Sequence, residues 1–234
     1  MSFKIDLSAN KHFYYWILPL ISTGILVILN HSGVELLQTF VAPIINREFG
    51  MLEHLQAIVI LVIVVIAFSG LQKRRHWIEN LGYLMLGILF IIAFLEELDY
   101  GLHYYEYFAG VAPEQKVVER NLHNYNNNEY LYEVRQGIIM VMILVFIILP
   151  LAKDKIKIKF IQHFCGDKML IATFAVYVVI GQMARLFPKL GLPINPSLDG
   201  NHQEFEELVS YYMMLLFVYE LTVIKRPLFA SKNE

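Results

Sequence analysis

The sequence predicts an all-α protein, a polytopic transmembrane helical bundle of about six spans with a long outer loop that carries short helices. Of its 234 residues, 57% are hydrophobic and 17% are charged, whereas an average soluble domain has about 25% charged residues. Six stretches are apolar and long enough to cross about 30 Å of hydrocarbon, which takes roughly 20 helical residues. We therefore expect residues 1–234 to form a single integral-membrane domain.

The expected spans are rich in Leu, Ile, Val and Phe. They cover residues 14–30, 51–71, 78–98, 134–152, 169–186 and 208–224. The first is not expected to be a cleaved signal peptide, because its apolar core is long and no small-residue cleavage site follows it. Residues 34–45 are apolar but short and interrupted, so we expect an interfacial helix or a re-entrant segment there.

The basic residues predict the orientation of the bundle. With a cytoplasmic N-terminus, most of the 19 Lys and Arg residues fall in inner segments, and each inner loop is richer in them than its outer neighbours. The positive-inside rule then places both termini in the cytoplasm. Most of the 21 Asp and Glu residues fall on the outer side, although acids contribute little to orientation. This excess indicates that the outer face uses carboxylates.

Two carboxylates follow directly on the apolar run of the third span, namely Glu96 and Glu97. Burying a carboxylate there costs several kcal/mol unless it is paired, protonated or bound to a metal. A helix that continued past this pair would carry three more polar residues on the face of Glu96: Asp99, His103 and Glu106. The alternative is a solvated helix extension with ordinary surface charges.

Three further segments bring acids or imidazoles to the same predicted level. Glu53 opens the second span, where the helix dipole alone also favours an acid. Glu119 and His123 lie four residues apart in the long outer loop, so on a helix both could bind one metal ion. Glu204 and Glu207 lie three apart at the entry to the last span, where dipole complementarity is again the alternative.

Together these segments predict one outward-facing Glu/His site. The expected catalytic residues are Glu96 and Glu97. The expected metal ligands are Glu53, Glu119, His123 and Glu207. Secondary candidates are His103, Glu204, Arg185, Gln182, Asn121 and Asn124. Imidazole and carboxylate donors suit a divalent metal such as Zn²⁺, Fe or Mn.

Other chemistries lack their signals in this sequence. The single cysteine, Cys165, excludes an intramolecular disulfide and a cysteine-based zinc site. A Gly-x-Ser-x-Gly elbow and a phosphate-binding Gly-rich loop are both absent from the sequence. The charge pattern offers no basic face for nucleic acid.

Some of these residues form a series of short motifs. They are Glu96-Glu97, Tyr100-Gly101, Pro113-Glu114 and Glu119-Arg120-Asn121-Leu122-His123-Asn124, preceded by Glu48, Gly50 and Glu53. The series resembles a family of bacterial multi-pass membrane proteins whose activity is not established, with a looser likeness at Glu204–Glu207. His103 departs from the family pattern and is a less secure ligand than His123. The resemblance implies a bacterial inner-membrane location and supports the choice of residues but not a reaction. The charge pattern predicts that the site faces the periplasm or exterior.

The leading functional hypothesis is a metal-dependent membrane hydrolase that acts on a lipid or lipid-linked substrate at the outer leaflet. The first alternative is a non-catalytic membrane subunit or assembly factor, in which a carboxylate–Arg network is structural and aromatic residues around Tyr104 form an interfacial belt or a partner surface. The second alternative is a proton- or ion-coupled transporter. Expected partners are membrane lipids, and a membrane protein or a second copy of the chain.

Overall fold

A computed structural model describes residues 10–43, 49–72, 76–111, 128–198 and 203–225, with the side chains of His103 and of residues 128–135 excepted. The described residues form helices and no strand, which confirms the predicted all-α class. Six helical segments are long and apolar enough to cross a membrane. They are Phe13–Asn30, Met51–Ser69, Trp77–Glu97, Gln136–Lys155, Leu170–Lys189 and Gln203–Ile224. These helices are compatible with a multi-pass membrane protein.

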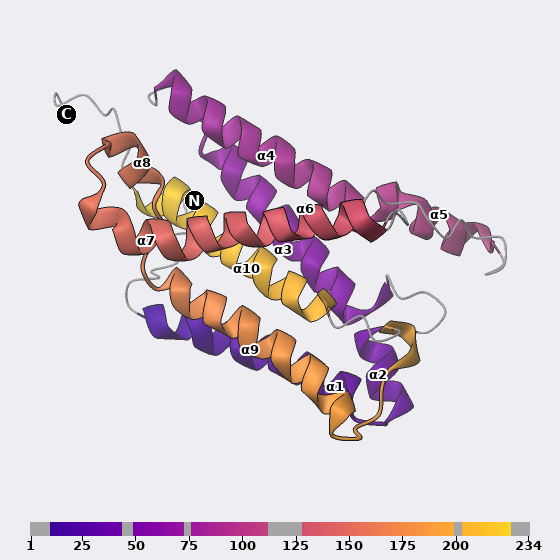
Figure 1. Ribbon diagram of the computed structural model, residues 1–234. Helices are drawn as coiled ribbons and strands as arrows, with labels where there is room; N and C mark the ends of the chain where they lie inside the picture. Colours follow the sequence, from indigo (N-terminus) through magenta and orange to yellow (C-terminus); the bar gives the residue numbers. More distant parts are fainter. Residues whose placement is uncertain (1–9, 44–48, 73–75, 112–127, 199–202, 226–234) are drawn as a thin grey trace.

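The α-helices that contribute to these segments have the following bounds (Figure 1). They are α1 Leu18–Asn30, α3 Met51–Ser69, α4 Trp77–Glu97, α6 Asn128–Ile143, α7 Leu149–Ala152, α9 Leu170–Lys189 and α10 Gln203–Tyr219. Three π-helical turns extend α1, α6 and α10. They are η1 Phe13–Ile17, η6 Leu144–Ile148 and η9 Glu220–Ile224. The remaining short elements are α2 Glu35–Val41, η3 Asp99–Gly101, α5 Leu102–Ala109, η7 Lys153–Lys155, α8 Lys159–Phe164 and η8 Pro196–Leu198.

Local sequence explains several helix ends. Pro19 lies in the continuous helix formed by η1 and α1, where it has no N–H for the Tyr15 carbonyl, and the Thr173 hydroxyl of α9 donates to that carbonyl instead at 2.5 Å. The side chain of Asp167 accepts a hydrogen bond from the Met169 N–H at 2.9 Å, which caps the start of α9. The last span begins at Gln203 instead of the predicted residue 208, because the acids of its first turn are part of the helix that they favour.

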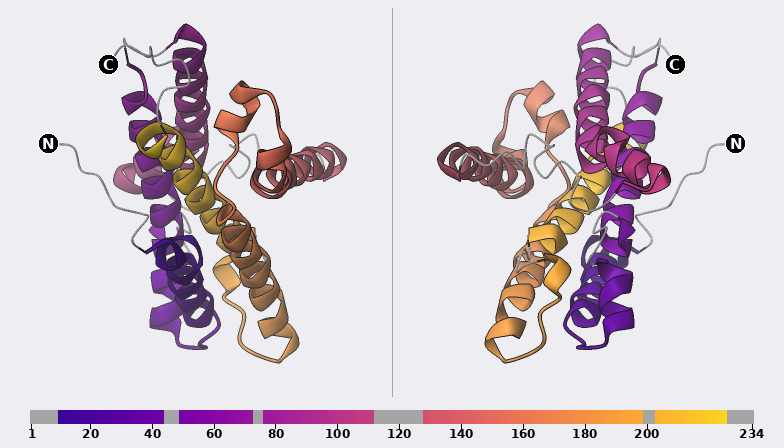
Figure 2. Two further views of the ribbon diagram at one scale, coloured as in Figure 1. Left: turned by 90° about the vertical axis from the view of Figure 1, so that its left-hand side faces the viewer. Right: turned by 90° about the vertical axis from the view of Figure 1, so that its right-hand side faces the viewer.

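Helix α10 is the centre of the bundle. It packs against α3, α9 and α1, and α3 in turn packs against α4. Half of the spanning window of α10 is buried, against 17% for the segment that contains α6. Figure 2 shows α6 and α7 standing apart from the other helices in both views. Phe146 of η6 nevertheless reaches the core and packs edge-on against Phe217 at 5.7 Å between ring centroids.

Contacts between helix ends define two ends of the bundle. At one end, the Gln56 amide of α3 donates to the Glu204 carbonyl of α10 at 2.9 Å. At the other end, the Tyr83 hydroxyl of α4 donates to the Leu221 carbonyl at 2.7 Å. We call the first the carboxylate end, formed by the starts of α3 and α10 and the ends of α1, α4 and α9. We call the second the opposite end; the described chain termini lie there.

An amide cluster ties the connections together at the carboxylate end. The buried Asn195 side chain donates to the Asn30 side chain at 3.0 Å and to the backbone carbonyls of Gln38 and Ala42 at 3.1 and 3.2 Å. Its own oxygen accepts from the Ser197 hydroxyl at 2.8 Å. One side chain thus holds the end of α1, the helix α2 and the connection between α9 and α10 in one arrangement.

Candidate functional site

Carboxylates from α4 and α10 meet at the carboxylate end. The Tyr211 hydroxyl of α10 donates to the Glu97 carboxylate of α4 at 2.5 Å. Glu204 and Glu207 lie seven and four residues before Tyr211 on the same helix, and both interact electrostatically with its hydroxyl. One acidic side chain therefore contacts Tyr211 directly, and two more lie within electrostatic range of it on its own helix.

Helix α3 adds an amide and a further acid to this group. Gln56 is fully buried, and its amide nitrogen lies 3.5 Å from the Glu204 carboxylate in addition to its bond to the Glu204 carbonyl. The amide oxygen of Gln56 has no hydrogen-bond partner among the described residues. Glu53 lies one helical turn earlier and is also buried. The buried Glu53 of α3 and Glu204 of α10 and the half-buried Glu97 of α4 thus lie at one end of the bundle.

The secondary candidate Arg185 pairs with an acid that was not among the predicted site residues. Its guanidinium pairs with the buried carboxylate of Glu206, and the Tyr177 hydroxyl lies 3.4 Å from the same carboxylate. Gln182, one turn before it on α9, is exposed. Arg185 and Glu206 thus form a contact between α9 and α10 beside the acidic group.

A glycine makes room for this ion pair. A Cβ atom at Gly181 would lie 2.0 Å from the Glu206 carboxylate oxygen, so the Glu206 side chain lies directly against the α9 backbone. Gly181→Ala is expected to displace the Glu206 carboxylate and to weaken its contact with Arg185, at a cost of about 1–3 kcal/mol. Thermal unfolding in detergent measures this effect. Gly24→Ala is the matched control, since its Cβ would meet Ile180 at an ordinary 3.9 Å; equal stability of the two variants would contradict the prediction.

The predicted stripe after Glu97 is wrong, because the helix does not continue. Helix α4 ends at Glu97, and Asp99, Tyr100 and Gly101 follow with positive φ values of 51°, 53° and 81°. Two consecutive non-glycine residues in this region cost about 1–3 kcal/mol each, and such strain clusters at functional sites. The break changes the direction of the chain, so Glu106 on α5 does not share a helix face with Glu96.

The Tyr100 hydroxyl returns across this break to donate to the Glu96 carboxylate. That hydrogen bond raises the pKa of Tyr100 above its ordinary value. The Glu96 carboxylate is therefore hydrogen-bonded to the exposed Tyr100, whereas its neighbour Glu97 contacts α10. The two predicted catalytic carboxylates have different surroundings.

Several predicted site residues lie outside the described part of the chain. They are Glu119, Asn121, His123 and Asn124. His103 falls in α5, but its side chain is not among those described. Of the four predicted metal ligands, the structure therefore describes Glu53 and Glu207. Within the described ranges, no group of three or more His, Cys, Asp or Glu side chains is arranged to hold a metal ion.

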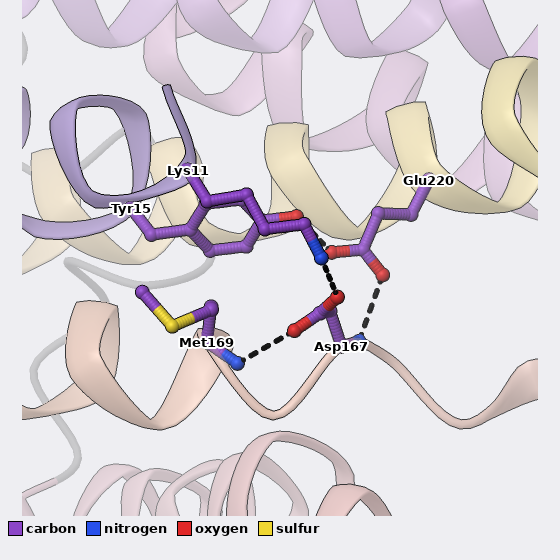
Figure 3. A network of polar contacts seen from close by, with 5 residues as sticks. All are labelled: Lys11, Tyr15, Asp167, Met169 and Glu220. Atoms are coloured by element: carbon purple, nitrogen blue, oxygen red, sulfur yellow. Dashed lines mark hydrogen bonds and ion pairs between the residues drawn. The ribbon is translucent and has the colours of Figure 1, made fainter. Parts of the chain in front are cut away.

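A second polar network, at the opposite end, was not predicted (Figure 3). The buried Glu220 carboxylate accepts from the Tyr15 hydroxyl and from the Asp167 backbone N–H, the latter at 2.8 Å. Asp167 in turn pairs with Lys11 at 2.5 Å. The network joins η1, the start of α9 and η9. The signal for it was the acid Glu220 inside an apolar span, a position where charges are rare and are paired.

The electrostatics of this end favour the ionised form of Asp167. Burial opposes its charge, but the hydrogen bonds from Lys11 and from the Met169 N–H outweigh that effect and lower the pKa of Asp167 below its ordinary value.

Burial lowers the pKa of Lys225 to about 8. The Lys225 amine donates to the backbone carbonyls of His163 and Cys165, at the C-terminal end of α8.

The Lys225 amine gives the stability a specific pH dependence. Its pKa is about 8 in the folded protein and 10.5 as the ordinary value, so the unfolded chain binds more protons between these two pH values. Stability of the native protein relative to Lys225→Met is therefore expected to rise from pH 8 toward pH 10.5. Unfolding in detergent across this pH range measures the difference. A difference that is flat or falls with pH would contradict the assignment.

No family model, curated protein or solved structure matches the chain.

Proposed function

We propose that the carboxylate end is the site of a metal-dependent integral-membrane enzyme that acts on a lipid or lipid-linked substrate. The observation that carries the proposal is that acids from three helices, the buried Glu53 of α3 and Glu204 of α10 and the half-buried Glu97 of α4, lie at one end of a bundle of apolar helices. Ionisable side chains in membrane helices are costly, and they mark functional sites by default. Backbone strain at Asp99 and Tyr100, beside the end of α4, adds a second feature typical of such sites.

The proposed roles are those that the chemistry of the side chains supports. Glu53 and Glu207 would bind the metal from α3 and α10, with Glu119 and His123 of the outer loop as further ligands. Glu97, oriented by the Tyr211 hydroxyl, would act as general base, with Glu96 as the other candidate. A bound Zn²⁺, Fe or Mn ion would polarise an ester, amide or phosphoryl oxygen.

The proposed orientation has the carboxylate end facing the periplasm or exterior of a bacterial inner membrane. Lysines gather at the opposite end, where Lys11, Lys168 and Lys225 pair with acids or backbone carbonyls. Basic residues favour the cytoplasmic side of a membrane. A site at the outer boundary would meet lipid headgroups, which is why a lipid or lipid-linked substrate is preferred to a soluble one.

One observation favours the alternative of a non-catalytic subunit or assembly factor. Arg185 and Glu206 form an ion pair that joins α9 to α10 beside the acidic group. If the remaining acids are also structural, the outer face would bind a membrane protein partner or a second copy of the chain. Metal analysis separates the two functions.

The test measures metal in the protein purified in detergent. We expect bound Zn, Fe or Mn in the native protein, less metal in His123→Ala and Glu207→Gln, and unchanged metal but lost turnover of membrane lipids in Glu97→Gln. Asp154→Asn is the control, because this exposed carboxylate pairs with Lys168 at the opposite end. A folded protein that is free of metal and does not take up any of the three ions would overturn the proposal.

A further inference from the structure

The outward face of α5 is aromatic and apolar. Tyr105 and Phe108 are 68% and 81% exposed, and Leu102 lies on the same face three residues before Tyr105. Glu106, the acid of this helix, is instead buried. A helix at a water-covered surface has the reverse pattern, with polar residues outward and apolar residues inward. The surroundings of the α5 outward face are therefore expected to be apolar.

The other side of α5 is held by an aromatic contact. Phe49, just before α3, packs against Tyr104 and Tyr107 with ring centroids 5.1 and 4.8 Å away. Aromatic pairs at such distances add about 0.5–1.5 kcal/mol beyond their buried area. This contact fixes the rotation of α5 and leaves Tyr105 and Phe108 pointing away from the bundle.

The position of α5 along the chain sets its depth. Helix α4 has 21 residues, and at 1.5 Å per residue it is about 31 Å long, close to the thickness of the hydrocarbon core. The left-handed residues Asp99–Gly101 end that helix, and α5 begins at the next residue. Figures 1 and 2 show α5 at the end of α4, outside the main packing of the bundle. If α4 crosses the membrane, α5 lies at the boundary between headgroups and acyl chains.

We infer that α5 is an interfacial helix that lies along the membrane surface with Leu102, Tyr105 and Phe108 inserted among lipid headgroups and the upper acyl chains. Tyrosines and other aromatic residues are enriched at this level, and helices of this kind bury their apolar face about 5–10 Å into the boundary. The lipid surface, rather than a protein, is the partner because the aromatic face begins where the apolar length of α4 ends. The inference does not depend on the proposed enzyme function.

The test places a single tryptophan on each side of α5. In a Trp16→Phe, Trp77→Phe background, Tyr105→Trp reports the outward face, and Phe108→Trp is a second variant on that face. Tyr104→Trp, against Phe49 and only partly exposed, is the matched control. Each protein is reconstituted in phosphatidylcholine vesicles whose acyl chains carry bromine either near the glycerol or near the methyl end. Bromine quenches a nearby indole, so its position in the chain reports depth.

We expect the outward tryptophans to lose most of their emission with bromine near the glycerol and less with bromine near the methyl end. Tyr104→Trp is expected to lose less emission than the outward tryptophans with either lipid. Quenching by aqueous acrylamide without quenching by bromine would show a water-exposed face and overturn the inference. Emission that neither reagent quenches would show that protein, such as a second copy of the chain, covers this face, and would also overturn it. Stronger quenching by bromine near the methyl end would place α5 inside the hydrocarbon core and would also overturn the inference.

Discussion

Replacing Gly50 with alanine is expected to destabilise the protein by about 3 kcal/mol, the upper end of the usual cost of overpacking. A Cβ atom at this position would lie 2.2 Å from the Val41 carbonyl oxygen and 2.9 Å from the Ala42 Cα. Both are backbone atoms, so no side-chain rotation relieves the clash. The backbone angles of Gly50, φ −71° and ψ 158°, suit alanine. The requirement for glycine therefore comes from the close approach of α2 to the start of α3.

The same substitution should disturb the carboxylate end. Helix α3 begins at the next residue, and its first two turns carry Glu53 and Gln56. Thermal unfolding in detergent measures the loss of stability, and metal content measures the effect on the site. Gly24→Ala, whose Cβ would meet a side chain at 3.9 Å, is the control. A Gly50→Ala protein as stable as the native one would show that α2 and α3 do not approach this closely.

The second large effect is expected at the opposite end of the bundle. Glu220→Leu leaves two donors without an acceptor, the buried Tyr15 hydroxyl and the partly buried Asp167 N–H. At about 1–3 kcal/mol for each unsatisfied group, the loss of stability should be about 3 kcal/mol. Unfolding in detergent measures it. Asp154→Asn is the control, since an exposed ion pair contributes only about 0–1 kcal/mol.

A double-mutant cycle separates the contact from a general effect on packing. Tyr15→Phe in the Glu220→Leu background removes one of the two orphaned donors, so the double variant is expected to be more stable than Glu220→Leu alone. The backbone donor of Asp167 remains unsatisfied in both, so recovery is partial. Additive losses in the two single variants would contradict a direct contact between Tyr15 and Glu220.

The helical class and the six apolar segments could be predicted from the sequence, because the length and composition of a membrane-crossing helix are local properties. The burial of Glu53 was one of two possibilities, because the helix dipole also stabilises an acid in the first turn of a helix at the surface. The orientation of the bundle and the metal ligands remain predictions.

The individual contacts could not be predicted, because they depend on residues far apart in the chain. Nothing in the sequence connects Tyr211 to Glu97 or Gln56 to Glu204. The stripe expected after Glu97 failed for a local reason: the chain enters the left-handed region at Asp99, one of the few residue types that tolerate it, and Gly101 completes the break. The signal for this break in the sequence was Gly101, two residues after Asp99.

The place of α10 in the chain order has a consequence for biogenesis. This helix holds α1, α3 and α9 together, yet it is made after all of them. If the helices cross a membrane, Tyr15, Gln56 and Arg185 lack their partners in α10 and η9 until this last segment has been made. We therefore expect the earlier helices to pack loosely until α10 joins them and completes the bundle.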